Sequence, residues 1–417
     1  MNPTLALTPL TDAGRWFVDL AEQHAAEVAV RADEHDRAGT FPREAFESMK
    51  ESGFLAAPVP EEFGGRGLTS FHDLGVGLNR LARGDGSVAI AANMHLTFCL
   101  IGARTLRGAQ EDGDQEQVEQ LGGFMHLLGQ GAIAMANATE PGTDLRHPLA
   151  EVTTTEGGLA LSGRKIFGTL SEIADIFFVP ARRRRADDTY TMGASMVFRG
   201  AAGQEIKSNW DALGMRASGS HDVVYESCFV PEDLFLTDDA DWGTFDRLNL
   251  IIASGANFSL VCTSLGIAEA ARDLVVDMAR TRKKAPSGRP IAERRGVQHL
   301  VAEIEVDLAT CRGLLDSVGR LIDEHLARRR VGDVTFDDLH GLNKEFQCAK
   351  LVVNRKAIEV VDRALSVSGG AGYMTASPLS RLYRDVRAGP FMQPFSPVEV
   401  HEYIGKIALG IDPTLDD

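Results

Sequence analysis

The spacing of apolar residues predicts a helical block at the start of the chain. From residue 12 to about residue 130 apolar positions recur at the helical period, as in the stretch that contains Trp16, Val18 and Leu20. Pro42 stands where the first turn of a following helix tolerates proline. Glycines and a proline in residues 59–68 mark a loop between helices. We therefore expect an N-terminal all-α domain over residues 1–130.

The pattern changes from helical to alternating near residue 131. β-branched and polar residues alternate in 151–155, a Gly-Gly turn follows, and 159–161 completes an expected hairpin. Three more short apolar runs predict strands, and they cover residues 176–179, 196–198 and 223–225. These segments predict a middle β-sheet domain, barrel-like or sandwich-like, over residues 131–240.

Helical periodicity returns beyond residue 245 in long segments. The expected helices cover residues 248–280, 297–327, 336–367 and, more briefly, 397–409. Four such helices are typical of an antiparallel bundle, which we expect over residues 241–417. The fold class is therefore α+β, with a helical N-terminal domain, a middle β domain and a C-terminal four-helix bundle.

Composition narrows the class of protein. The 417 residues are 44% hydrophobic and 24% charged, which is typical of a soluble globular protein, and the start of the chain has no signal-peptide pattern, so we expect a cytoplasmic protein without a membrane partner. The net charge of −16 argues against a nucleic-acid partner, because phosphate binding needs a basic surface. Five scattered cysteines without a C-x-x-C pair suggest neither a disulfide framework nor a metal site.

Several motifs resemble those of the acyl-CoA dehydrogenase superfamily. Residues 59–68 resemble its PxxxGGxG loop, and residues 368–373, followed by Arg384-Asp385, resemble its GGxGY…RD signature. The order of helical, β and helical domains is also similar over nearly the whole chain. The resemblance implies a flavoprotein that forms a homodimer or homotetramer and shares its flavin between subunits.

Two more motifs imply where the flavin ring binds. Residues 136–144 look like the family's TEPGxGSD motif, so Ala138 and Thr139 are expected at the pyrimidine edge of the flavin. Donors at that edge stabilise the anion that forms when flavin is reduced. Residues 163–169 resemble GxKxWITN, which implies that Phe167 packs on the ring and that Thr169 bonds near flavin N5.

The adenine half of the cofactor matches less closely. The resemblance places Arg282, Arg295, Gly369 and Gly370 near the pyrophosphate of FAD. Arginines and glycines suit phosphate binding. However, residues 283–288 replace the compact RxxFG motif, and Arg295 falls where a glutamine is usual. FAD is the expected cofactor, with FMN or a diffusible reduced flavin as the alternatives.

The substrate side departs from the family. Gln393 lies eight residues after Asp385, where the family's catalytic glutamate is expected, and an amide is not a base. Ala256 falls at the alternative base position of the family. Ser254 and Asn257 replace the aspartate and arginine that frame the thioester.

Two histidines remain as candidates for proton transfer in place of the missing base. His95 lies on an N-terminal helix that faces the substrate cavity in this superfamily, and His221 follows the Gly-Ser-rich segment 214–220. Histidine titrates near neutrality, which suits this role.

Three functions stay open. The first is a flavin oxidoreductase with dehydrogenase-like chemistry on an acyl thioester or a related small molecule, which the whole-chain resemblance favours. The second is a monooxygenase (hydroxylase) of the same fold that takes reduced flavin from a partner flavin reductase. The third is a non-catalytic subunit of a hetero-oligomeric dehydrogenase.

Overall fold

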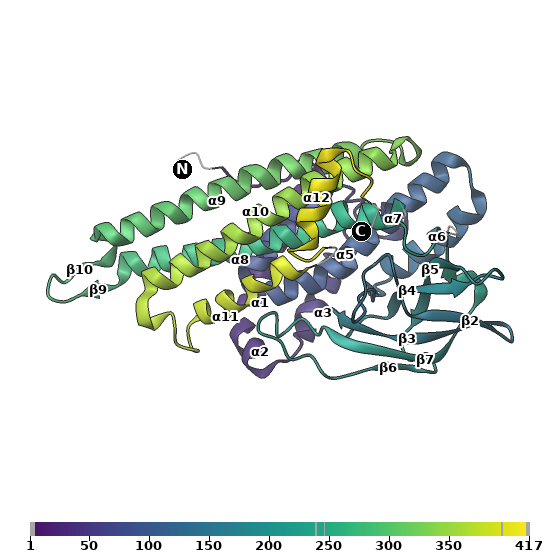
Figure 1. The fold of residues 1–417 in the computed structure, drawn as a ribbon. Coiled ribbons are helices and arrows are strands. Elements are labelled where there is room, and N and C mark those ends of the chain that lie inside the picture. Colours follow the sequence, from purple (N-terminus) through teal and green to yellow (C-terminus); the bar gives the residue numbers. More distant parts are fainter. Residues whose placement is uncertain (1–4, 238–239, 246, 393–394, 414–417) are drawn as a thin grey trace.

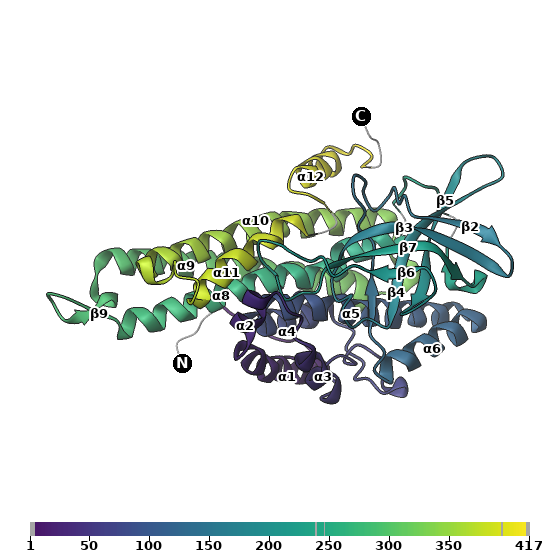
Figure 2. The same ribbon diagram turned by 90° about the horizontal axis from the view of Figure 1, so that it is seen from below.

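A computed structural model describes residues 5–237, 240–245, 247–392 and 395–413. A long helical body runs the length of the molecule, and a β-sheet lies beside one end of it (Figure 1). The view from below places the N-terminal helices along one side of this body and the C-terminal helix α12 on the other (Figure 2). The α+β fold expected from the sequence is thus confirmed.

The N-terminal region is helical throughout. Trp16 and Leu20 lie on its first helix, which begins after Thr11, whose hydroxyl accepts a hydrogen bond from the Gly14 N–H at 2.9 Å. Pro42 caps the third helix. The helices are α1 (Asp12–Ala29), α2 (Ala32–Ala38), α3 (Arg43–Glu51), α4 (Phe71–Gly84), α5 (Gly86–Asp112) and α6 (Gln115–Gly129), with a 3₁₀ turn η1 (Glu61–Phe63) in the glycine-rich loop.

One sheet forms the middle of the chain, in the strand order β6-β7-β3-β2-β4-β5-β8, with β1 parallel to β4. The expected hairpin is present, and it pairs Val152 with Leu161. The strands are β1 (Ala134–Ala136), β2 (Glu151–Thr155), β3 (Gly158–Gly168), β4 (Ile176–Arg184), β5 (Tyr190–Phe198), β6 (Gln204–Ile206), β7 (His221–Val230) and β8 (Phe235–Leu236).

Three long helices make up most of the C-terminal region. Helix α4 of the N-terminal region packs closely on α8, and Gly266 permits this approach, because a Cβ there would lie 2.2 Å from the carbonyl oxygen of Asn79. The helices are α7 (Arg247–Ile251), α8 (Asn257–Thr281), α9 (Arg295–Ile322), α10 (Phe336–Ser368), α11 (Pro378–Asp385) and α12 (Glu399–Leu409). The sequence pattern did not predict α11, and it did not predict the π-helical turns η3 (Ile252–Ala256) and η5 (Asp323–Ala327).

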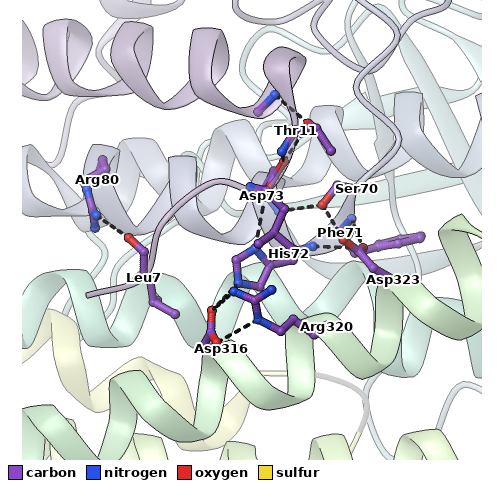
Figure 3. Close-up of polar contacts among 12 residues, drawn as sticks. Leu7, Thr11, Ser70, Phe71, His72, Asp73, Arg80, Asp316, Arg320 and Asp323 are labelled. Atoms are coloured by element: carbon purple, nitrogen blue, oxygen red, sulfur yellow. Dashed lines mark hydrogen bonds and ion pairs between the residues drawn. The ribbon is translucent and has the colours of Figure 1, made fainter. Parts of the chain in front are cut away.

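A buried network of carboxylates, named here the His72 network, joins the N-terminal segment, α4 and the end of α9 (Figure 3). Asp73 accepts hydrogen bonds from the N–H groups of Leu10 (2.7 Å) and Thr11 (3.0 Å). The His72 ring lies between Asp73 and Asp316, at 3.2 and 3.1 Å. Burial raises the pKa of Asp73, but the hydrogen bonds from His72, Leu10 and Thr11 outweigh it, and the pKa lies below its usual value.

Two helices are apolar and long enough to cross a membrane by length and composition. They are Gly86–Asp112 and the continuous segment Arg247–Thr281. However, 83% and 94% of their apolar windows are buried inside the protein. Both are therefore core helices of the protein.

Candidate flavin site

The two segments that resemble flavin-ring motifs lie against each other at the edge of the sheet. The first follows β1 and contains Ala138 and Thr139. The second is the end of β3. The N–H of Ile166 donates to the carbonyl oxygen of Thr139 at 2.8 Å, which fixes one segment on the other. The structure therefore brings together the ring-binding residues expected from two distant parts of the sequence.

A buried ion pair holds the same two segments together. The Lys165 ammonium is fully buried, pairs with Glu140 and donates to the carbonyl oxygen of Pro180 at 2.6 Å. Glu140 also accepts hydrogen bonds from the N–H groups of Leu149 (2.9 Å) and Ala150 (3.1 Å). Burial lowers the pKa of Lys165, and Glu140 opposes this shift. A buried pair with these extra hydrogen bonds fixes the shape of the loop.

The turn after β3 is strained and exposes an aromatic ring. Phe167 and Leu170 have positive φ angles of 53° and 76°, which are unusual for residues with side chains. The Phe167 ring is 58% exposed and meets the Trp210 ring edge to face, with 6.0 Å between centroids. Such strain often marks a functional site, and here it leaves a large apolar ring exposed on the surface.

Hydrogen bonds from hydroxyl groups and a histidine fix the residues around this turn. The Thr169 hydroxyl lies 2.8 Å from that of Ser220. His221 accepts hydrogen bonds through Nδ1 from the N–H groups of Asn209 (3.1 Å) and Trp210 (3.0 Å), and its Nε2 lies 3.0 Å from Glu172. His221 thus uses both ring nitrogens to place Trp210. It is part of the support of the site.

These residues fit a flavin ring. An exposed aromatic face, an oriented threonine hydroxyl and an irregular strand end are the groups that an isoalloxazine needs on one side. Asn137 lies directly beneath the turn, is 1% exposed, and its Nδ2 has no hydrogen-bond partner within the described part of the chain. A buried donor without a partner is costly unless a ligand accepts from it.

The residues expected at the adenine half lie elsewhere in the chain. Arg282 follows α8 and donates to the carbonyl oxygen of Ser368 at 2.8 Å, beside Gly369 and Gly370 at the end of α10. Arg295 is exposed at the first residue of α9.

The two groups of expected flavin residues are separated within one chain. The hairpin of β9 (Lys283–Lys284) and β10 (Arg289–Pro290), which starts next to Arg282, lies at the far end of the helical body from the sheet (Figure 1). The structure therefore joins Arg282 with the two glycines but separates them from Thr139 and Phe167.

The substrate side of α8 begins with a π-helical turn. Ala256 and Ser254 lie in this turn, η3, and both are buried. The Ser254 hydroxyl donates to the carbonyl oxygen of Leu250 at 2.9 Å. Asn257 is 7% exposed, and its Nδ2 has no partner among the residues described. Single π-helical turns are frequent at functional sites.

His95 is held by the backbone. Its Nδ1 accepts from the N–H of Ala134 at 3.1 Å, and the ring also bonds the backbone at Leu55. The ring is 1% exposed, and burial lowers the pKa of His95 to about 4. The neutral His95 imidazole thus bridges α5, β1 and the loop after α3, and it also lines a cavity together with residues of that loop, so its role as a base stays a prediction.

The position of the family's glutamate, Gln393, lies outside the described residues. The described residues on either side of it are anchored by Lys350 of α10, whose ammonium donates to the carbonyl oxygens of Met392 (2.5 Å) and Phe395 (2.9 Å). Burial lowers the pKa of Lys350 to about 8. Lys350 is thus a positioning residue for this segment.

The Arg384-Asp385 pair joins the three regions of the chain. Arg384 donates to Asp36 of α2 at 2.9 Å and to the carbonyl oxygen of Leu213 at 3.2 Å. Asp385 accepts from the N–H of Met215 at 2.7 Å, and burial raises the pKa of Asp385 to about 7. The pair therefore acts in the assembly of the fold.

Sequence reasoning missed several residues that build the site. Lys165 and Glu140 both lie inside the matched motifs, but nothing in their spacing shows that they pair. Trp210 and Lys350 stand outside every motif that the sequence offered. A pattern search finds residues that touch a ligand, and it overlooks those that support them.

Comparison with known proteins agrees with this geometry. Three sequence profiles match the chain, namely the N-terminal, middle and C-terminal domains of acyl-CoA dehydrogenase, over residues 11–116, 132–228 and 258–395. L-evernosamine nitrososynthase of a Micromonospora species is 37% identical over 97% of this chain and 92% of its own length. Amino sugar nitrososynthase DnmZ of Streptomyces peucetius is 34% identical over 96% and 95%.

A solved structure extends the likeness to three dimensions. KijD3 in complex with FMN and dTDP-3-amino-2,3,6-trideoxy-4-keto-3-methyl-D-glucose is 32% identical, with a TM-score of 0.87 over 98% of this chain and 97% of that one. The relative therefore holds a flavin and an amino sugar nucleotide on the same fold.

Proposed function

The chain belongs to the acyl-CoA dehydrogenase family and is a flavin-dependent oxidoreductase, and from this premise we propose that it oxygenates the amino group of a nucleotide-linked amino sugar with reduced flavin and O₂. This is the second of the three functions left open by the sequence, the reduced-flavin-dependent monooxygenase, with a more specific substrate. The acyl-thioester alternative is not the one we propose.

The observation that carries the proposal is that neither position where the family places its base holds a carboxylate, while the segments that resemble the flavin-ring motifs are present. Dehydrogenation of an acyl thioester needs a carboxylate to remove the α-proton, and such a base contributes about 10²- to 10⁴-fold. Ala256 is a buried methyl group, and Gln393 is an amide. Attack of an amine on an activated oxygen needs no carboxylate at either place, because a neutral amine is already a nucleophile.

Reduced flavin, when bound, would supply two electrons for each O₂. In the first turnover the amine, O₂ and reduced flavin would give the hydroxylamine, one water and oxidised flavin. In the second the hydroxylamine, O₂ and reduced flavin would give the nitroso sugar, two waters and oxidised flavin. The chain's own residues would hold the ring. Phe167, supported by Trp210, would pack on one face, Thr139 and Thr169 would bind the edge, and Asn257 would present a buried amide donor on the substrate side.

We propose FAD as the cofactor and a homo-oligomer as the assembly. Since the hairpin β9–β10, next to Arg282, lies at the far end of the helical body from the sheet, a second copy would have to supply Arg282 and Gly369 to the adenine half of the same flavin (Figure 1). A flavin reductase supplies the reduced cofactor, and we place both proteins in the cytoplasm.

The cofactor assignment has its own test. Arg282→Gln removes the guanidinium that would pair with a phosphate, so its affinity for FAD should fall about tenfold while its affinity for FMN, measured by fluorescence titration, stays unchanged. Equal losses for both flavins would assign Arg282 to the fold. No loss for either would leave FMN as the cofactor.

The experiment that tests the function supplies the purified protein with a flavin reductase, NADH, O₂ and a dTDP-linked amino sugar. Mass spectrometry should find products that carry one added oxygen, labelled when ¹⁸O₂ is used. A parallel anaerobic arm adds a panel of acyl-CoA thioesters to the flavin-loaded protein. Bleaching of the flavin by an acyl-CoA, or reoxidation of reduced flavin without any oxygenated sugar across the amino sugars tried, would overturn the proposal.

A further inference from the structure

Arg104, on the second half of α5, is a buried cation without a counter-charge. It is 7% exposed, and none of Nε, Nη1 and Nη2 has a hydrogen-bond partner within the described ranges 5–237, 240–245, 247–392 and 395–413. A guanidinium carries five N–H donors and no acceptor. Burying such a charge unpaired is strongly unfavourable, so a partner is expected in the working protein.

Other cations surround Arg104. Burial, together with the neighbouring Arg107 and Arg247, lowers the pKa of Arg104 to about 10, while Glu111 alone opposes them. Arg107 is fixed beside it, because its guanidinium donates to the carbonyl oxygens of Ala327 (2.7 Å) and Arg329 (3.0 Å). The local charge is therefore positive and rigidly held.

The nearby carboxylates are committed to other groups. Glu111 lies 3.6 Å from Arg107 and 4.0 Å from Arg330, and it accepts from the N–H of Val331 at 3.1 Å. Asp323, at the start of η5, accepts from the Ser70 hydroxyl and from the N–H groups of the α4 start. Neither carboxylate neutralises Arg104.

A small cavity lies beside the Arg104 side chain. Its volume is about 30 Å³, and it is lined by Thr69, Phe71, Leu100, Ala103, Arg104, Arg107, Leu326 and Ala327. A space of this size holds about one water-sized particle. Charged groups on the lining are cationic, and the carbonyl oxygens of Leu326 and Ala327 already accept from Arg107.

We propose that this cavity binds one chloride-sized halide ion against Arg104. A halide only accepts hydrogen bonds and carries a negative charge, which matches the single unpartnered guanidinium of Arg104. A water molecule needs acceptors as well, and a phosphate group exceeds the volume. The site is separate from the flavin motifs, since no residue of the cavity belongs to them, and it does not depend on the proposed function.

The first test measures thermal unfolding of the flavin-loaded protein at constant ionic strength, with sodium gluconate replaced stepwise by sodium chloride. Gluconate is too large for the cavity. A hundredfold excess of chloride over its Kd should raise Tm by about 3 °C for a chain of this length. In Arg104→Met the chloride dependence should disappear, and Tm in gluconate should equal or exceed that of the parent.

The matched control is Arg312→Met. Arg312 is as deeply buried as Arg104 but pairs with Glu269 at 2.6 Å. This variant should unfold at a lower temperature and keep the full response to chloride. Loss of the response in both variants would mean that chloride acts on the protein in general, and the proposal would fail.

The second test needs no variant. Crystals of the parent protein soaked in sodium bromide should show an anomalous peak within hydrogen-bonding distance of the Arg104 guanidinium. An ordinary water without anomalous signal at that place, or equal Tm values in chloride and gluconate, would overturn the halide site.

Discussion

The His72 network and the Arg104 cavity are neighbours, but buried charge is hydrogen-bonded in the first and lacks a partner among the described residues in the second. They share Phe71 and the π-helical turn η5. In the network, Asp323 accepts from three groups of the α4 start, so its carboxylate is satisfied. In the cavity, a guanidinium of similar burial has no such partner in the described chain. A closed network indicates a structural role, and an open one indicates a place for a ligand.

The largest effect is expected from Asp73→Ala. The substitution leaves the N–H groups of Leu10 and Thr11 and the His72 ring without their acceptor. We expect the free energy of unfolding to fall by about 3 to 5 kcal/mol, as for removal of one partner from a buried network. Urea unfolding followed by far-UV circular dichroism measures it. A loss below about 1 kcal/mol would show that the network is not closed in solution.

Replacing the paired Arg312 and the unpaired Arg104 by methionine should change the free energy of unfolding differently. Arg312→Met removes one partner of Glu269, which is 2% exposed, while Arg83 still contacts Glu269 at 2.6 Å. We therefore expect the free energy of unfolding to fall by about 2 to 3 kcal/mol. Arg104→Met removes an uncompensated charge and should cost nothing in halide-free buffer. Equal losses in the free energy of unfolding of the two variants would show that Arg104 is as fully paired in solution as Arg312.

The sequence predicted the fold well because periodicity carries it. The hairpin at 151–161 and the helix over 336–367 appear where the pattern placed them, since each buries one regular face. The network and the cavity follow no period. Asp323 accepts from the His72 N–H across 251 residues, and nothing local distinguishes Arg104 from an exposed arginine of an amphipathic helix.

The flavin site lies between these extremes. Motifs predicted Thr139 and Phe167 as ring contacts, but the supporting Trp210 and the Lys165–Glu140 pair emerged only from the tertiary structure. The sequence also did not predict the π-helical turn at Ala256, because a helical pattern does not reveal one extra residue in a turn. Motifs thus predict candidate ligand contacts and miss contacts that tertiary packing creates.

A pH experiment extends the comparison to a third buried carboxylate. Burial raises the pKa of Asp385 from 3.8 to about 7, so the folded protein binds a proton there that the unfolded chain has lost. This group's contribution to stability is fully present below pH 3.8 and is lost as the pH rises to about 7. A tenfold difference in proton affinity between the folded and unfolded chain corresponds to about 1.4 kcal/mol.

Asp385→Asn isolates that contribution, because the amide oxygen still accepts from the Met215 N–H. The difference in free energy of unfolding between variant and parent should grow in favour of the variant from pH 4 to about pH 7, by about 1 to 3 kcal/mol. Urea titrations at closely spaced pH values measure it. A constant difference across this range would place the pKa of Asp385 near its ordinary value.

The smallest effect is expected from Asp316→Asn at the rim of the His72 network. The Asp316 side chain is 33% exposed, and it touches His72 at 3.1 Å and Arg320 at 2.8 Å. Burial raises the pKa of Asp316, but Arg320 and His72 bring it below the usual value. Because asparagine keeps an acceptor for the ring and water can reach the rim, we expect a loss below about 1 kcal/mol in urea unfolding. A loss equal to that of Asp73→Ala would mean that the network depends on a charge at its rim as much as on its buried hydrogen bonds, and exposure would no longer separate its members.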